Sequence, residues 1–288
     1  MGKILVVGAT GKVGGQLVKL LVRNGKVFRA ATRHPSMFTE AFGKFSEAAE
    51  FDYEDPRTFA PALAGIDKVF LIARPGDNRS DKVAAPFIDE AKKAGIRLIV
   101  NLTAMGVEND DTFMLRILER YIEDSGIPYT HLRPNWFMQN FNSPPMFTEI
   151  RTTGKLHLPA ADATLSFIDV RDIAAVAYTA LTDNGHQGKA YTLTGGEALT
   201  HFQVTEKLSR VSGKTIAYVP ISEEAARAGL AGNGFPPELI ERWTDFYRKI
   251  RRGLCSVISS DVNRILGRPA ITFDKYAADY AETWRQIS

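Results

Sequence analysis

Over the first 134 residues, short apolar runs alternate with stretches in which apolar residues recur at every third or fourth position. The short runs predict strands buried on both faces, and the longer stretches predict helices with one apolar face. Repeated strand–helix–strand units predict an α/β fold, a doubly wound parallel sheet with helices on both sides. The predicted strands are Ile4–Val7, Val27–Thr32, Ala49–Phe51, Lys68–Ile72, Arg97–Thr103 and Tyr129–Leu132.

The pattern changes after Pro134, where aromatic residues and prolines replace regular periodicity. A strand-and-helix pattern resumes near Phe167, and the last ninety or so residues are mainly helical in pattern. There, Thr200 and Gln203 have the spacing of a capping box and predict a helix start. We therefore expect a smaller, mainly helical C-terminal lobe beside the sheet. The expected division is a nucleotide-binding core at 1–134, a lobe insertion at 135–166, a return to the core at 167–194 and the C-terminal lobe at 195–288.

Composition excludes several classes of protein. The 288 residues are 44% hydrophobic and 24% charged, as is usual for globular proteins. One cysteine, Cys255, is too few for a disulfide framework or a cysteine-based zinc cluster, and none of the five histidines is spaced two or four residues from another, so we expect no metal site. The net charge of +3 comes without a basic block, so no nucleic-acid partner is expected. With no targeting signal or long apolar segment in the sequence, we expect no membrane association and a cytoplasmic location.

A glycine-rich turn links the first predicted strand to the first predicted helix. It reads Gly8-Ala9-Thr10-Gly11-Lys12-Val13-Gly14, a GxxGxxG pattern placed between a strand and a helix. In such a turn Gly8 permits the tight bend, Gly11 lets a pyrophosphate approach the backbone and Gly14 lets the helix pack on the strand. The helix N-terminus then favours an anion. The residues expected to hold a dinucleotide here are Gly8, Thr10, Gly11, Lys12, Val13 and Gly14.

The end of the second predicted strand distinguishes the two nicotinamide dinucleotides. An acidic residue there would accept hydrogen bonds from a ribose hydroxyl, but the sequence has Thr32, Arg33 and His34 instead. A guanidinium can bind a 2′-phosphate through two parallel hydrogen bonds, so Arg33 favours NADP, with NADPH preferred over NADH. After the third strand, Asp52 either contacts the adenine or caps the turn that follows it.

These motifs resemble those of the NmrA-like, atypical short-chain dehydrogenases. The resemblance also includes the runs Ile127–Pro134, Phe167–Ala174 and Leu266–Pro269, and it extends over essentially the whole chain. Within the family the sequence is most similar to bacterial NAD(P)H-dependent azo-dye, quinone and triphenylmethane-dye reductases, and it is also similar to the ergot-alkaloid dehydrogenases. The resemblance implies a Rossmann core, a small substrate lobe and a nicotinamide in the cleft between them. It further implies that the cofactor is lined by Ala73, Arg74, Thr103, Pro134, Asn135 and Phe137.

The proton relay of the main short-chain dehydrogenase branch is absent from this sequence. None of the nine tyrosines has a lysine four residues later, so an ordinary alcohol–ketone reaction is poorly supported. The remaining candidate donors are Thr103 and Tyr121, although Tyr121 also fits the buried face of its helix. Apolar residues after strand ends could instead stack an acceptor, and each could equally be core. These candidate substrate contacts are Met105, Trp136, Phe137, Met138 and Phe167.

Two functions remain open from the sequence. The first is an NADPH-dependent reductase that transfers hydride to a small, flat, conjugated acceptor: a quinone first, and an azo dye or iminium second. Such acceptors are already electron-poor, so their reduction requires stacking and exclusion of solvent more than a proton donor. The second is a regulator that senses NAD(P) and binds a protein partner without turnover, which the missing relay also allows.

Overall fold

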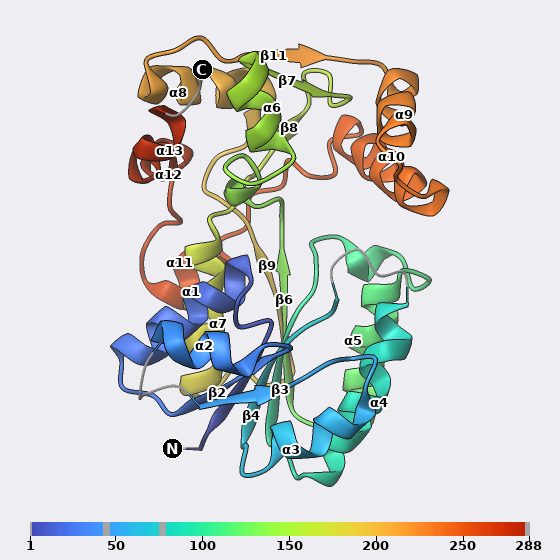
Figure 1. Ribbon diagram of the computed structural model, residues 1–288, viewed down its shortest axis with the longest axis vertical. Helices are drawn as coiled ribbons and strands as arrows, with labels where there is room; N and C mark the ends of the chain where they lie inside the picture. Colours follow the sequence, from blue (N-terminus) through green and yellow to red (C-terminus); the bar gives the residue numbers. More distant parts are fainter. Residues whose placement is uncertain (1, 43–46, 75–78, 286–288) are drawn as a thin grey trace. The chain divides into compact units, whose positions relative to one another are not determined.

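The computed structural model describes residues 2–42, 47–74 and 79–285. The chain forms two compact units, which Figure 1 shows as ribbons. Unit 1 comprises Met1–Pro134, Val170–Leu193 and Arg264–Gly267; unit 2 comprises Asn135–Asp169, Thr194–Asn263 and Arg268–Ser288. The first expected boundary, after residue 134, coincides with the end of the first segment of unit 1. The return of 264–267 to unit 1 had no counterpart in the expected division.

Unit 1 contains a parallel sheet. Among the described residues seven strands form it, in the order β3-β2-β1-β4-β5-β6-β9, and each neighbouring pair is parallel. The order reverses between β1 and β4, which makes this the topological switch point of a doubly wound sheet. The predicted α/β fold class is therefore confirmed. The strands are β1 (Ile4–Val7), β2 (Phe28–Thr32), β3 (Glu47–Glu50), β4 (Lys68–Ile72), β5 (Leu98–Leu102), β6 (Tyr129–Pro134) and β9 (Lys189–Leu193).

Helices cover both faces of this sheet. In Figure 1, α1 and α7 pack together on one side, and α4 and α5 pack together on the other. The central strands are apolar and buried on both faces; every residue of β1 is at most 3% exposed. The helices of unit 1 are α1 (Lys12–Arg23), α2 (Pro35–Phe42), η2 (Pro56–Thr58), α3 (Phe59–Leu63), α4 (Ser80–Lys93), η3 (Val107–Asn109), α5 (Met114–Ser125) and α7 (Val170–Thr182).

The third strand was predicted at the wrong residues. The expected strand Ala49–Phe51 is in fact β3, Glu47–Glu50, at the edge of the sheet beside β2. An edge strand has one neighbour and carries exposed polar residues, so apolar runs do not mark its limits. Its first residue is held by an ion pair, in which Arg29 of β2 donates to the Glu47 carboxylate at 2.5 Å.

Unit 2 has two short sheets among mainly helical segments. β10 (Leu199–Thr200) pairs antiparallel with β8 (Thr164–Leu165), and β11 (Ala217–Pro220) pairs parallel with β7 (Lys155–Leu158). The capping box predicted at Thr200 is confirmed, because its hydroxyl accepts from the Gln203 amide and the Gln203 side chain accepts from the Thr200 amide. The helices are η4 (Met138–Asn140), α6 (Met146–Thr153), α8 (His201–Ser212), α9 (Glu223–Gly232), α10 (Pro237–Arg251), α12 (Phe273–Asp279) and α13 (Ala281–Arg285). Helix α11 (Asp261–Leu266) begins in unit 2 and ends in unit 1, which includes Arg264–Gly267.

An aromatic core holds unit 2 together and contains a histidine. His201 of α8 is 1% exposed, and its ring lies 5.6 Å from that of Phe167, 6.1 Å from Phe141 and 5.2 Å from Tyr218. Burial lowers the pKa of His201 from 6.5 to about 4, because the charged imidazolium would lose its hydration there.

This buried histidine makes stability depend on pH. Between pH 6.5 and about 4 the unfolded chain binds a proton at His201 that the folded chain does not, so stability falls as the pH is lowered. We expect His201→Phe to reduce the slope of unfolding free energy in this range by about 1.4 kcal/mol per pH unit. Urea unfolding at a series of pH values measures the slope; equal slopes for the two proteins would refute the assignment.

Candidate functional site: the glycine turn and the carboxyl edge of the sheet

The glycine turn connects β1 to α1 at the switch point of the sheet. Gly8 has a φ of +72°, a left-handed conformation that favours glycine, and the Gly11 amide donates to the Gly8 carbonyl at 2.9 Å. Helix α1 begins at Lys12, and its N-cap residue, Gly11, makes no side-chain hydrogen bond to the helix. The amide groups in the first turn of an α-helix have no hydrogen-bond partner within the helix, so such an end can bind an anion.

The third glycine shows how closely the turn and helix are packed. A Cβ atom at Gly14 would lie 2.1 Å from the Gly8 carbonyl oxygen, whereas one at Gly15 would lie 3.6 Å from its nearest neighbour, the Ala9 carbonyl oxygen. Thr10, Gly11 and Lys12 are exposed. The turn thus presents open backbone and a helix N-terminus, a cradle that fits the pyrophosphate of a dinucleotide.

The residues after β2 and β3 have different surroundings. Arg33 follows β2 directly and is exposed, and within the described part of the chain its guanidinium has no hydrogen-bond or ion-pair partner. The carboxylate of Asp52 accepts from the Glu54 amide at 3.0 Å, and the Asp52 amide donates to Thr58. The structure thus favours the turn-capping interpretation of Asp52 and leaves Arg33 available to an anion.

Two further predicted cofactor residues follow β4. Ala73 is 8% exposed, and Arg74 is exposed and donates to the Glu54 carboxylate at 2.8 Å. Arg79 donates to the same carboxylate at 3.4 Å. Ala73 and Arg74 stay proposals for the cofactor lining, since both follow a strand at the carboxyl edge of the sheet.

A buried ion-pair network joins α5 to the carboxyl ends of β5 and β6, and its central residue was not among the predicted site residues. Glu119 of α5 is fully buried and accepts from Thr103 Oγ1 at 2.8 Å, from Arg133 Nη2 at 2.7 Å and from Arg116 Nη1 at 2.9 Å. Burial alone would raise the pKa of Glu119, but these hydrogen bonds and charges hold it below its ordinary value. An acid one turn after Leu115, on the helix face that carries Ile122, was the signal available in the sequence.

This network determines what Thr103 can do. Its hydroxyl donates to Glu119, and its amide donates to the Leu132 carbonyl at 2.8 Å. A hydroxyl proton held by a buried carboxylate is not free for a substrate. The structure therefore favours a positioning role for Thr103, which ties β5 to α5 and β6, and its role as a proton donor stays a prediction.

The network also brings together side chains of metal-ligand type. Within the described residues, Glu119, Glu123 and His131 place ligand atoms within 4.8 Å of one another. Arg116 donates to both carboxylates, at 2.9 and 3.0 Å, and burial lowers the pKa of His131 to about 4. Because guanidinium groups already neutralise both carboxylates, we interpret the cluster as an ion-pair network and not as a cation site.

The other candidate proton donor, Tyr121, lies on the surface of α5. It is 37% exposed, and its hydroxyl donates to Asp89 of α4 at 2.8 Å. This hydrogen bond raises the pKa of Tyr121, the opposite of what a proton-relay tyrosine needs. The prediction of a buried Tyr121 is therefore wrong, and its link to α4 favours a structural role.

The predicted residues at the end of β6 divide between backbone and side-chain roles. The Pro134 carbonyl accepts from the Met105 amide at 2.9 Å, which fixes the turn after β5. The Asn135 side chain is fully used within unit 2: Nδ2 donates to Ser166 Oγ and to the Cys255 carbonyl, both at 2.8 Å, and Oδ1 accepts from the Trp136 amide. The Asn135 side chain therefore joins three segments of unit 2, and its role as a cofactor residue stays a prediction. Met105 and Phe137 are partly exposed and stay proposals.

The candidate substrate contacts of unit 2 differ in exposure. Met138 and Phe167 are each 1% exposed, so the structure favours their alternative interpretation as core. Trp136 is partly exposed and stacks on Phe246 of α10 with ring centroids 4.7 Å apart, while Trp243 meets it edge-on at 5.6 Å. Trp136 is thus the member of this set that belongs to a partly exposed aromatic cluster.

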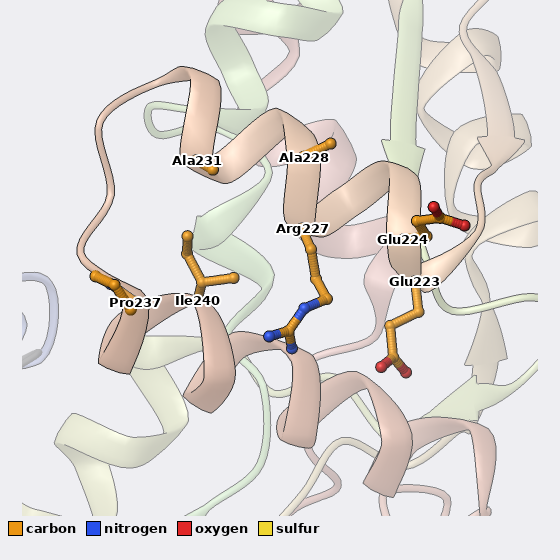
Figure 2. A pocket seen from close by; sticks show the side chains of 7 residues that line it. All are labelled: Glu223, Glu224, Arg227, Ala228, Ala231, Pro237 and Ile240. Carbon is orange, nitrogen blue, oxygen red and sulfur yellow. The ribbon is translucent and has the colours of Figure 1, made fainter.

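A groove runs between α9 and α10 in unit 2, with a volume of about 640 Å³. Figure 2 shows Ile240 pointing from α10 toward α9, and Glu223 and Arg227 extending from α9 toward α10. Arg227 donates to Glu241 at 2.7 Å, and Glu223 accepts from Arg248 at 2.6 Å. Every residue of α9 is at least partly exposed, and these ion pairs join α9 to α10.

A parallel sheet with a glycine turn at its switch point defines an open α/β protein of the Rossmann type. A model of the NmrA-like family matches residues 1–248. The chain therefore belongs to the NmrA-like family, as the resemblance implied. None of the described helices is both long enough and apolar enough to cross a membrane.

Three relatives illustrate this family. The chain is 34% identical to an NAD(P)H azoreductase of Xenophilus azovorans, over 96% of this chain and 98% of that protein. It is 36% identical to a (4-alkanoyl-5-oxo-2,5-dihydrofuran-3-yl)methyl phosphate reductase of Streptomyces griseus, over 98% and 99%. The solved structure of the NADPH-dependent quinone oxidoreductase QOR2 of Escherichia coli, complexed with NADPH, superposes with a TM-score of 0.84 at 25% identity and covers 96% of this chain and 99% of that one.

Proposed function

We propose that this chain is an NADPH-dependent oxidoreductase that reduces a small, flat, conjugated acceptor, a quinone first and an azo dye or iminium second. Two features carry the proposal: the open glycine turn at Gly8–Gly14, which follows β1, and the exposed Arg33, which follows the neighbouring strand β2. Arg33 has no hydrogen-bond or ion-pair partner among the residues that the structure describes. Together the turn and Arg33 offer sites for a pyrophosphate and for a 2′-phosphate. The relatives named above, which include an azoreductase and a quinone oxidoreductase, support the same chemistry.

The chain's own residues supply binding and orientation. NADPH, when bound, supplies the hydride. The backbone of Gly11–Gly14 and the N-terminus of α1 would hold the pyrophosphate, and Arg33 the 2′-phosphate. Thr103 and Tyr121 direct their hydroxyl protons to Glu119 and Asp89. This arrangement supports acceptors whose reduced form takes its proton from water, as quinones and electron-poor dyes do.

The absorbance of NADPH at about 340 nm tests the proposal, with purified protein, a quinone and a protein-free control. We expect the absorbance to fall at a rate proportional to protein concentration. If NADPH binds but no quinone, dye or iminium in a panel is reduced, the reductase proposal is refuted.

Arg33 provides a sharper prediction about the cofactor. We expect Arg33→Ala to weaken NADPH binding by about 1–3 kcal/mol, since one charge-assisted contact is lost, and to leave NADH binding nearly unchanged. Arg23→Ala, which removes an exposed arginine at the far end of α1, is the matched control. Fluorescence titration measures both affinities, and equal losses for NADPH and NADH would show that Arg33 does not contact the 2′-phosphate.

A second candidate function is an NADP-sensing regulator that binds a protein partner without turnover. The hydrogen bonds of Thr103 and Tyr121 also favour this function, since they engage the two hydroxyls that the sequence offers as proton donors. The absorbance assay separates the two functions. A sensor would bind NADPH, and the NADPH absorbance would stay constant with every acceptor. It would also bind its protein partner with only one redox form of the cofactor.

A further inference from the structure

The carboxylate at the centre of the buried network in unit 1 has all of its acceptor positions filled. Glu119 Oε1 accepts from Thr103 Oγ1 at 2.8 Å and from Arg133 Nε at 2.9 Å. Its Oε2 accepts from Arg133 Nη2 at 2.7 Å and from Arg116 Nη1 at 2.9 Å. A carboxylate offers about four lone-pair positions, so these hydrogen bonds occupy it fully. The Glu119 side chain is therefore held in one orientation.

The same network fixes the carboxyl ends of two neighbouring strands. Thr103 directly follows β5, and Arg133 is the residue before the last in β6. The Thr103 amide donates to the Leu132 carbonyl at 2.8 Å, and the Met105 amide donates to the Pro134 carbonyl at 2.9 Å. The turn after β5 is thus bonded both to the backbone of β6 and, through the Thr103 hydroxyl, to the buried carboxylate of α5.

Stability alone does not explain a buried charge at this place. An apolar replacement of a buried ion pair is often neutral or stabilising. Helix α5 supplies such apolar packing beside Glu119, since Leu118 and Ile122 are both fully buried. A polar network whose members are all hydrogen-bonded makes the surrounding structure rigid and specifies one arrangement. The network therefore suits a task that depends on the precise position of the strand ends.

The position of this network within the sheet indicates what it aligns. Open α/β sheets bind a dinucleotide outside the carboxyl ends of their strands, across the switch point, which lies here between β1 and β4. The glycine turn and Arg33, proposed for the pyrophosphate and the 2′-phosphate, follow β1 and β2. The nicotinamide half of the cofactor then falls outside the ends of β4, β5 and β6, where Thr103 lies.

We propose that Glu119 is a positioning residue for hydride transfer, which acts through Thr103 by fixing the turn after β5 against the nicotinamide ring. This inference rests on the proposed reductase function. In the reaction a hydride, H⁻, leaves NADPH for the quinone, and the proton that completes the hydroquinone comes from water. The transfer requires the two carbons to be aligned, and a displacement of about 1 Å can slow a reaction about a hundredfold.

The experiment compares Thr103→Val with Thr103→Ser and Thr130→Val. Valine resembles threonine in shape but lacks the hydroxyl, whereas serine keeps the hydrogen bond to Glu119. Thr130→Val is the matched control, because Thr130 is fully buried in β6 and its hydroxyl donates to the His186 carbonyl at 2.8 Å, near the amino end of the strand. All three variants leave the Glu119 charge and its two arginine partners in place.

Two measurements are made on each full-length protein. The first is the emission spectrum and the Kd of bound NADPH without an acceptor, because the fluorescent group is the reduced nicotinamide ring. The second is kcat for menadione, a naphthoquinone. We expect Thr103→Val to shift the emission of bound NADPH toward that of free NADPH and to lower kcat about tenfold. The Kd of NADPH should stay within about twofold of wild type, since the phosphate contacts are distant. Thr103→Ser and Thr130→Val should match the wild type.

Each other outcome bears on the inference. Equal changes in Thr103→Val and Thr130→Val would overturn it by showing a purely structural role. A lower kcat with unshifted emission would also overturn it, since the hydroxyl would then act as a proton donor. If the wild type does not oxidise NADPH, the reductase proposal is refuted; a shifted emission of Thr103→Val would still support the positioning of the ring, and an unshifted one would overturn it.

Arg133→Lys repeats the test if Thr103→Val does not fold. Lysine keeps the positive charge but loses the two-point contact that the Arg133 guanidinium makes with Glu119. We expect the same shift in the emission of bound NADPH, because the carboxylate is then no longer held in one orientation. An emission spectrum identical to that of the wild type would overturn the inference.

Discussion

Gly14→Ala is expected to raise the Kd for NADPH about a hundredfold. The added Cβ would lie 2.1 Å from the Gly8 carbonyl oxygen and 2.8 Å from its carbon, so the turn or the first turn of α1 must move. The backbone amides proposed to hold the pyrophosphate then lose their alignment. Two lost charge-assisted hydrogen bonds correspond to about 3 kcal/mol, which is about two orders of magnitude in affinity. Fluorescence titration with NADPH measures the change.

Gly15→Ala is the control for this prediction. It adds the same atom one residue later, where the nearest neighbour is the Ala9 carbonyl oxygen at 3.6 Å, an ordinary contact. Alanine also favours a helix interior by roughly 0.5–1 kcal/mol over glycine. We therefore expect Gly15→Ala to bind NADPH as the wild type does. If both variants bound equally well, the close packing at Gly14 would not shape the cofactor site.

Glu119→Gln should destabilise unit 1 by about 3–5 kcal/mol. The substitution keeps the shape of the side chain but removes the charge that pairs with Arg133 and Arg116, and a buried charge without its partner is costly. The pKa of Arg133, which this pair holds above its ordinary value against the effect of burial, reflects the same interaction. Urea unfolding at neutral pH measures the loss.

Glu123→Gln, one turn further along α5, is the matched control. Its side chain is 28% exposed and pairs with the same Arg116 at 3.0 Å. A partly exposed ion pair contributes about 1 kcal/mol or less, so we expect a small change. Similar losses for the two variants would show that the burial of Glu119 is not what makes its charge important.

The fold and the glycine turn could be predicted because their signals are local in the sequence. Buried parallel strands are continuous apolar runs, and the glycine spacing between Ile4–Val7 and the following helix is dictated by a single turn. The capping box at Thr200 and Gln203 is likewise contained within four residues. The edge strand β3 was displaced, since a strand with one neighbour and exposed glutamates lacks that apolar signal.

The roles of individual polar side chains could not be predicted, because their partners come from distant segments. The sequence does not distinguish Thr103 from Tyr121 as a proton donor. Only the structure shows that the Thr103 hydroxyl donates to Glu119 and the Tyr121 hydroxyl to Asp89. Asn135 follows the end of a strand, where a cofactor contact is expected. Its side-chain Nδ2 instead donates to Ser166 Oγ and to the Cys255 carbonyl.

The sequence by itself determined the parallel α/β architecture, the family, the glycine turn after the first strand and the exposed arginine at the end of the second strand. These depend on periodicity and spacing over a few residues. The tertiary structure decided which polar groups are already bonded and to which partners. Those outcomes depend on contacts between residues up to 120 positions apart, such as Asn135 and Cys255, and no local pattern encodes them.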